Sequence, residues 1–327
     1  MRHITRHFLR AVLGLGCIAL GAAGHAANSY PDHPVHLIVP SSPGSTLDLV
    51  ARTFTPALGT ELKQSFVVEN KAGASNITGT REVVVAAPNG YTIGMISSNH
   101  AVNPSLHKHL PYDSVKDITP ITIIGTTPLV LVVPKNSPYK TVGQLIAAAK
   151  AHPGKINYGS AGTGTALHLA ALLFTSKANI DVVHIPYKGG NPLITDLMSG
   201  QIDFAFLGTP SILSQVKAGT LHALAVTTLK RSSTLPEVPT LNESGLTGYD
   251  YDPWIALFGP AKLPAAITQL LQSKVHDILN RPDVKKQFAV QGFVPTGSSS
   301  ADALATIQND IKVSAALLKA AHIEAVD

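Results

Sequence analysis

Short hydrophobic runs alternate along the chain with longer stretches that are apolar on one side only. The runs at 35–39 and 129–133 are rich in Val, Ile and Leu, which is typical of buried strands, whereas the stretch 47–62 has apolar residues at helical spacing. The sequence predicts strands at 35–39, 65–69, 91–96, 129–133, 156–159, 182–186, 202–207 and 223–227, and helices at 47–62, 142–151, 166–177, 192–198 and 210–218.

This alternation predicts an α/β fold with mainly parallel sheets flanked by helices. Extended segments at 121–133 and 254–258 separate two such blocks, and the chain from 264 onward looks helical. Because these last helices follow a complete second block, we expect them to return to the first domain. The predicted domains are 27–126 plus 251–327 and 127–250, joined by two hinge crossings around a ligand cleft.

The first 26 residues have the pattern of a secretory signal peptide. They carry Arg2, Arg6 and Arg10 without an acid, then an uncharged apolar run at 11–24, and small residues before a cut after Ala26 or Ala27. The run is shorter than the roughly 20 residues of a membrane span. We therefore expect export to the periplasm. The alternative, a lipid on Cys17, lacks the aliphatic residue expected three positions earlier.

Composition and charge exclude several classes of protein. Hydrophobic residues make up 45% of the 327 residues, which is too many for a disordered chain, and a single cysteine excludes a disulfide scaffold. The net charge is +5, but removing the three signal arginines leaves 22 basic and 20 acidic residues. Because basic clusters are absent from the sequence, we expect no nucleic acid partner.

Two loops rich in small and hydroxyl residues, 40–48 and 158–168, each lie between a predicted strand and a predicted helix. A helix start presents unpaired N–H groups and a positive dipole end, so each loop is suited to an anion. Ligands of open α/β sheets bind at the carboxyl ends of strands, where both loops lie. Ordinary helix capping explains either loop alone, but together they favour a grip on one carboxylate from two sides.

Enzyme motifs are absent or mismatched, since the sequence has no nucleophile elbow, dinucleotide fingerprint or P-loop. The alternative to a binding protein is a secreted hydrolase that uses Ser160 and His168. We expect no enzyme, no cofactor and no metal, and we interpret His100, His107 and His109 as surface histidines.

Three further residues leave alternatives open. Asp203 lies in an apolar run, so it either braces the Gly-rich loop 158–168 by accepting backbone N–H groups or receives a ligand amine. Lys188 is either a solvated turn residue or a cleft cation. Trp254, on the predicted hinge segment, either packs in the core or lines the cleft.

Six segments resemble one known family over essentially the whole chain after the signal. They are VVENKAG at 67–73, APNGYT at 87–92, LPYDSVKD at 110–117, PGKINY at 153–158, HIPYKG at 184–189 and LPEVPT at 235–240. These segments are similar to those of the substrate-binding proteins of tripartite tricarboxylate transporters, the Bug family. The resemblance implies a two-domain, type II-like periplasmic binding protein that delivers a small mono- or dicarboxylate to a large and a small membrane subunit. We expect a monomer, and a role as a ligand sensor for a signalling partner stays open.

The family's ligand-binding positions can be matched to this sequence residue by residue. The matched or adjoining positions are Gly44, Ser45, Thr46, Asp48, Ser97, Asn99, Ser160, Ala161, Gly162, Gly164, Thr165, His168, Asp203 and Thr209. The first loop departs from the family pattern, because it has one glycine and places Leu47 where a threonine is common. The resemblance therefore implies a conserved carboxylate grip with a different ligand shape or affinity.

Mass spectrometry of the mature protein tests the predicted signal. We expect a chain that begins at residue 27 or 28 and carries no lipid, because the apolar run is followed by a cleavable small-residue site. A mature chain that begins at a lipidated Cys17 would contradict this prediction.

Overall fold

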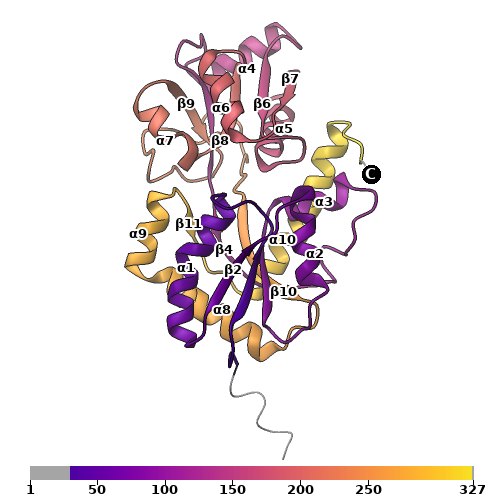
Figure 1. Cartoon of the computed structure of the whole chain (residues 1–327). Helices are drawn as coiled ribbons and strands as arrows, with labels where there is room; N and C mark the ends of the chain where they lie inside the picture. Colours follow the sequence, from indigo (N-terminus) through magenta and orange to yellow (C-terminus); the bar gives the residue numbers. More distant parts are fainter. Residues whose placement is uncertain (1–29, 326–327) are drawn as a thin grey trace, which may run out of the picture.

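Two β-sheets, each covered by helices on both faces, form the body of the protein (Figure 1). The computed structural model describes residues 30–325, so the predicted signal peptide lies outside the described residues. Both ends of the described chain build a six-stranded sheet, and the middle of the chain builds a five-stranded sheet.

The six-stranded sheet lies between two helical layers. Its elements are β1 (Val35–Val39), α1 (Thr46–Leu62), β2 (Phe66–Asn70), η1 (Ala74–Asn76), α2 (Ile77–Val84), β3 (Thr92–Ser97), α3 (Asn99–Leu106), β4 (Ile118–Thr126), β10 (Trp254–Pro260), α8 (Ala265–Asn280), α9 (Pro282–Val290), β11 (Val294–Pro295) and α10 (Ser300–Ala320). The strand order is β11-β4-β10-β3-β1-β2. Because neighbouring side chains of a strand point to opposite faces, Leu37 packs with α1, α8 and α9, whereas Ile38 packs with α2, α3 and α10.

The five-stranded sheet is covered in the same way. Its elements are β5 (Leu129–Pro134), α4 (Val142–Ala151), β6 (Asn157–Ser160), α5 (Ala166–Ala178), β7 (Val183–Pro186), α6 (Gly190–Ser199), β8 (Phe204–Gly208), α7 (Thr209–Lys217) and β9 (Leu221–Val226). The strand order is β7-β6-β8-β5-β9. Leu131 packs with α4 and α5, and Val132 packs with α6 and α7.

In each sheet the strand that enters from the other sheet runs against its neighbours, and the short edge strand β11 is also antiparallel to β4. β5 follows the first crossing and pairs antiparallel with β8 and β9, and β10 follows the second crossing and pairs antiparallel with β3 and β4. In contrast, β1 is parallel to β2 and β3, and β6 is parallel to β7 and β8. The predicted α/β fold is confirmed, with each sheet mixed. The parallel strands of both sheets end at the side where β5 and β10 begin.

The two crossings between the sheets are bonded to each other. Residues 127–128 lead from β4 to β5, and residues 250–253 lead into β10. The N–H of Thr127 donates to the carbonyl of Pro253 at 2.8 Å. Thr227, which follows β9, adds a second link: its Oγ1 accepts from the N–H of Leu129 at 3.0 Å, and its carbonyl accepts from the N–H of Tyr251 at 3.0 Å. The sheets are therefore joined by a short hydrogen-bonded ribbon and not by two independent linkers.

The sequence did not predict α2, α3 or β11. The presence of α3 explains why His100 is buried. The interpretation of His100 as a surface residue is wrong: it lies in the first turn of α3, is 3% exposed, stacks on Tyr112 and has Nε2 2.8 Å from the carbonyl of Ser114. Burial lowers the pKa of His100 to about 4. His107 is the C-cap of α3 and is half-buried, whereas His109 is exposed as expected.

A small apolar cluster joins the two parts of the molecule away from the crossings. It contains Leu106 of α3, Leu169 of α5 and Leu318 of α10. Gly164 lies so close to this cluster that an added Cβ would be 1.9 Å from Cδ1 of Leu106, and its φ of +76° also favours glycine. Gly164 therefore allows α3 to approach the Gly-rich loop.

Replacing Gly164 by Ala tests this approach. We expect Gly164→Ala to lower the free energy of unfolding by about 2–4 kcal/mol, because a steric overlap adds to backbone strain. Gly219→Ala is the matched control, since Gly219 has a φ of +68° with open space around the added Cβ, and should cost about 1–2 kcal/mol. Equal losses in urea unfolding would contradict a tight contact at Leu106.

Candidate functional site

A cavity of about 300 Å³ lies between the two sheets, beside the crossings. It is at the small end of ligand cavities in proteins. Residues from both sheets and both crossings line it, namely Thr46, Leu47, Ser97, Ser98, Asn99, Thr127, Leu129, Ala161, Ala166, Leu167, Gly190, Leu207, Gly208, Pro210, Ser211, Pro253, Trp254 and Ile255. A hollow of about 720 Å³ beside α4 and β9 is larger, but only residues of the middle of the chain line it.

Five helices begin at the cavity. The lining includes the first residues of four helices, Thr46 of α1, Asn99 of α3, Ala166 of α5 and Gly190 of α6, and the second residue of α7, Pro210. The first N–H groups of a helix have no acceptor within the helix, and the positive end of the helix dipole lies there. None of the lining residues is charged. The groups of this cavity that can attract an anion are therefore backbone N–H groups and neutral hydroxyl and amide side chains.

At α1 and α5 the first two N–H groups have no partner among residues 30–325. The capping hydroxyls of Ser45 and Thr165 accept from the third N–H group of each helix, at 3.4 Å in both cases. The N–H groups of Thr46 and Leu47 in α1, and of Ala166 and Leu167 in α5, are left as donors. One helix comes from each sheet, so the two pairs of donors reach the cavity from opposite sides.

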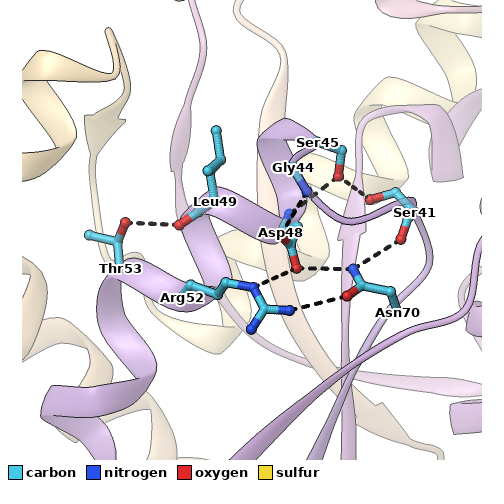
Figure 2. Close-up of polar contacts among 8 residues, drawn as sticks. All are labelled: Ser41, Gly44, Ser45, Asp48, Leu49, Arg52, Thr53 and Asn70. Carbon is cyan, nitrogen blue, oxygen red and sulfur yellow. Dashed lines mark hydrogen bonds and ion pairs between the residues drawn. The ribbon is translucent and has the colours of Figure 1, made fainter.

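A polar network behind the first loop holds the start of α1 in place (Figure 2). Asp48 is 3% exposed and accepts from the N–H of Gly44 at 2.9 Å, from Nε of Arg52 at 3.0 Å and from Nδ2 of Asn70 at 3.0 Å. Asn70 also donates to the carbonyl of Ser41 at 3.1 Å. Asp48 of α1 is thereby bonded to the loop directly at Gly44 and, through Asn70, at Ser41.

The same contacts set the charge state of Asp48. Burial raises the pKa of its carboxyl group, but the hydrogen bonds from Arg52, Gly44 and Asn70 outweigh burial, so the pKa lies below its ordinary value. The carboxylate is therefore ionised at neutral pH. Both of its oxygens already accept hydrogen bonds from protein donors, so they are not available to a cationic ligand.

The second loop is also held by its own polar groups. Oγ of Ser160, which is fully buried, lies 2.7 Å from Nε2 of His184 and accepts from the N–H of Gly162 at 3.2 Å. Oγ1 of Thr165 donates to the carbonyl of Gly162 at 2.8 Å, and the N–H of Gly164 donates to Nδ1 of His168 at 3.0 Å. These bonds fix the loop from behind.

Two stacked imidazoles support the second loop. The rings of His168 and His184 lie 4.1 Å apart and nearly parallel. Burial, with a smaller contribution from His184, lowers the pKa of His168 to about 3, and burial also lowers the pKa of His184. Both rings are neutral at physiological pH, which allows the close stack. The Ser160–His168 pair of the hydrolase alternative is not formed, because Ser160 contacts His184.

Four of the predicted site residues line the cavity, and ten do not. Those in the lining are Thr46, Ser97, Asn99 and Ala161. Those behind the lining, in the two loop networks, are Gly44, Ser45, Asp48, Ser160, Gly162, Gly164, Thr165 and His168. Both predicted loops adjoin the cavity, but the sequence motif does not separate residues that line the cavity from residues that hold the loop conformation.

The two remaining predicted residues are also outside the lining, Asp203 far from the cavity and Thr209 between the lining residues Gly208 and Pro210. Oδ2 of Asp203 accepts from the N–H of Asn157 at 2.8 Å, at the starts of β8 and β6 and thus at the strand ends opposite the cavity. Asp203 therefore braces a strand and not the Gly-rich loop or a ligand amine. Oγ1 of Thr209 donates to the carbonyl of Pro128 at 3.1 Å, which ties α7 to the first crossing.

The sequence did not identify most of the residues that line the cavity next to the two crossings, the part called here the hinge side. Leu129 begins β5, and Trp254 and Ile255 begin β10. Trp254 both packs in the core, at 3% exposure, and lines the cavity, with Nε1 donating to Asp310 at 2.7 Å. Oγ1 of Thr127 is buried without a hydrogen-bond partner among the described residues. Lys188 is exposed and does not line the cavity.

Residues 30–325 contain no group of three or more His, Cys, Asp or Glu side chains placed to hold a metal ion. No helix within the same range combines the length and hydrophobicity that spanning a bilayer requires.

Two sheets joined by two crossings, with helix starts around a cavity between them, define a two-domain ligand-binding protein of the periplasmic-binding-protein class. Residues 50–323 match the model of the tripartite tricarboxylate transporter family receptor. The chain therefore belongs to this receptor family.

Relatives and solved structures agree with this assignment. The protein BugT of Bordetella pertussis is 34% identical over 290 residues, which cover 88% of this chain and 89% of BugT. A structure described as a periplasmic transporter is 34% identical, has a TM-score of 0.79 and matches over 90% of this chain and 99% of its own. A protein of R. palustris solved with adipate is 30% identical, has a TM-score of 0.81 and matches over 91% of this chain and 100% of its own.

Replacing Asp48 by Asn tests the network behind the first loop. We expect Asp48→Asn to lower the free energy of unfolding by about 1–3 kcal/mol at pH 7, because an amide N–H₂ would face at least one of the three donors. Since the folded-state pKa of Asp48 is lowered, its contribution is present above the ordinary value of 3.8 and is lost as pH falls through the folded-state pKa.

Urea unfolding at pH 7 and pH 3 measures this dependence. The difference between the parent protein and Asp48→Asn should shrink at pH 3. Asp277→Asn is the control, because Asp277 is exposed on α8. A difference that does not change with pH would contradict the role of the ionised carboxylate.

Proposed function

We propose that this chain is a periplasmic solute-binding protein that captures a small carboxylate and delivers it to a tripartite tricarboxylate-type transporter. The observation that carries the proposal is the convergence of five helix starts on one cavity without a charged lining residue. Preorganised N–H groups bind a carboxylate through hydrogen bonds, and the absence of a counter-charge favours release to the next component.

The proposed domains are 27–126 plus 251–327 and 127–250, with the ligand held in the cleft between them. The carboxylate would lie between Thr46 and Leu47 on one side and Ala166 and Leu167 on the other. Because α1 and α5 belong to different sheets, a ligand held by both stabilises the arrangement in which the sheets face each other. The ribbon at residues 127–128 and 250–253 would act as the hinge.

Binding without catalysis fits the chemistry of the lining. Its polar side chains are hydroxyls and one amide, and no lining residue titrates near neutral pH. The family assignment and the adipate-bound relative support a carboxylate ligand. Export by the predicted signal, a monomeric state and docking on a large and a small membrane subunit complete the proposal.

Proline substitutions at helix starts test the site directly. Proline is accepted at the first position of a helix but has no N–H group, so Ala166→Pro and Thr46→Pro each remove one proposed donor while keeping the helix. The preceding residues, Thr165 and Ser45, already have the extended conformation that proline requires. We expect each variant to weaken carboxylate binding by about 1.5–3 kcal/mol.

Calorimetry with a panel of mono- and dicarboxylates measures the effect. The matched control is Ala265→Pro, at the exposed first position of α8, away from the cavity lining. This control should bind like the parent protein. Unchanged affinity in both Ala166→Pro and Thr46→Pro would place the ligand elsewhere.

A further inference from the structure

A second cavity adjoins the proposed ligand cavity. Its volume is about 260 Å³, nearly that of the ligand cavity at about 300 Å³. Its apolar lining comes from helices of both sheets, with Leu169 and Leu173 on α5 and Val313 and Leu317 on α10. Residues 250–254, from the second crossing and the start of β10, also line it. This cavity is called the hinge pocket below.

Three residues line both cavities, namely Ser98, Pro253 and Trp254. Residues that line two adjoining cavities form the wall between them. The backbone of this wall is fixed, because the N–H of Ser98 donates to the carbonyl of Trp254 at 3.0 Å and the carbonyl of Pro253 accepts from the N–H of Thr127 at 2.8 Å. The serine side chain is small and the proline ring cannot turn away from its backbone. The indole of Trp254 is therefore the largest part of the wall and the part that can change position.

One hydrogen bond orients this indole. Its Nε1 is the only donor of a tryptophan side chain, and it donates to Oδ2 of Asp310 at 2.7 Å. Asp310, on α10, lines the hinge pocket but not the ligand cavity. Trp254 also belongs to the core cluster that contains Ala303 and Ile307 of the same helix. The bond to Asp310 therefore holds the indole from the side of the hinge pocket.

The hinge pocket has acidic and apolar walls. Asp250, Asp252 and Asp310 line it, and its lining contains no Lys, Arg or His. Burial raises the pKa of Asp310, and it raises the pKa of Asp252 to about 6. A neutral alkyl chain can pack against the leucines and Val313 without adding charge beside these carboxyl groups. Alkyl chains are therefore suitable probes of this pocket.

We infer that Trp254, positioned by Asp310, closes the ligand cavity toward the hinge pocket and thereby limits the length of the carboxylate that binds. The inference rests on the proposed function and identifies a specificity-determining residue of the same site. The carboxylate lies at α1 and α5, and the body of the ligand ends at the indole. Without the indole the two cavities join, and the space for the ligand nearly doubles.

Shortening the wall tests the limit on length. Calorimetry with butanoate and decanoate gives the ratio of their dissociation constants, and the parent protein should bind butanoate more tightly. We expect Trp254→Leu to shift this ratio toward decanoate by at least about tenfold, the effect of burying roughly two more methylene groups. Trp254→Phe keeps more of the core packing and should shift the ratio in the same direction, so it replaces Trp254→Leu if that variant does not fold.

The matched control is Phe288→Leu, because Phe288 is a fully buried aromatic residue outside both linings. This control should lose stability and keep the parent ratio. An unchanged ratio in the Trp254 variants, or no binding of decanoate to either of them, overturns the inference and leaves the proposed function standing. If no carboxylate binds the parent protein, both fail.

Two substitutions of Asp310 test its positioning role. Asp310→Ala removes the acceptor of the indole N–H, whereas Asp310→Asn keeps an oxygen acceptor. Trp254 is the single tryptophan of the chain, so its fluorescence reports on the wall even without a ligand. In Asp310→Ala, acrylamide quenching should rise at least about twofold, because loss of the bond increases the population of displaced ring positions. The ratio of dissociation constants should shift toward decanoate in the same variant.

Asp310→Asn should restore both parent values. Asp277→Ala is the control, because Asp277 is exposed on α8 and lines neither cavity. Parent-like quenching and an unchanged ratio in Asp310→Ala contradict the assignment of Asp310 as a positioning residue.

Discussion

Unpaired backbone N–H groups at helix starts are the groups on which the site depends, and the strand directions explain why they meet. In each sheet, parallel strands end on the side where the hinge strands β5 and β10 begin. A helix that follows such a strand starts at that side, with its positive dipole end toward the other sheet. The convergence of α1, α3, α5, α6 and α7 on one cavity is thus a consequence of topology, and the crossings keep the two sets of helix starts opposite each other.

The buried side chains of Asp48 and Ser160 stabilise the loop conformations through hydrogen bonds and do not line the cavity. Asp48 is surrounded by donors from Gly44, Arg52 and Asn70, and Ser160 is held by His184. These contacts fix the loop conformations before a ligand arrives, so less conformational entropy is lost on binding. The unpaired N–H groups belong to Thr46, Leu47, Ala166 and Leu167, which line a cavity without a charged side chain. Supporting side chains and cavity wall are thus separate, so the cavity presents donors without a charged lining residue.

The elements and loops were predictable from local signals, whereas the direction of single side chains was not. Alternating residues such as Leu37 and Ile38 identify a strand buried on both faces, and Ser45 and Thr165 are recognisable helix caps. In contrast, α3 carries Pro104 and lacks a clear apolar period, so its start and the burial of His100 could not be predicted. Asp203 matched a motif, but its position at the start of β8 places it away from the cavity.

By itself, the sequence determined most of the strands and helices, the two loops and the family resemblance, because each depends on residues that are close together along the chain. Only the tertiary structure decided which residues line the cavity. The hinge side of the cavity combines Thr127, Leu207 and Trp254, which are separated along the chain and become neighbours only when the strands pair. The contact between Gly164 and Leu106 likewise depends on how the two sheets are placed. Hydrogen-bond pairing of distant strands, and not local propensity, therefore fixes the shape and the polarity of the cavity.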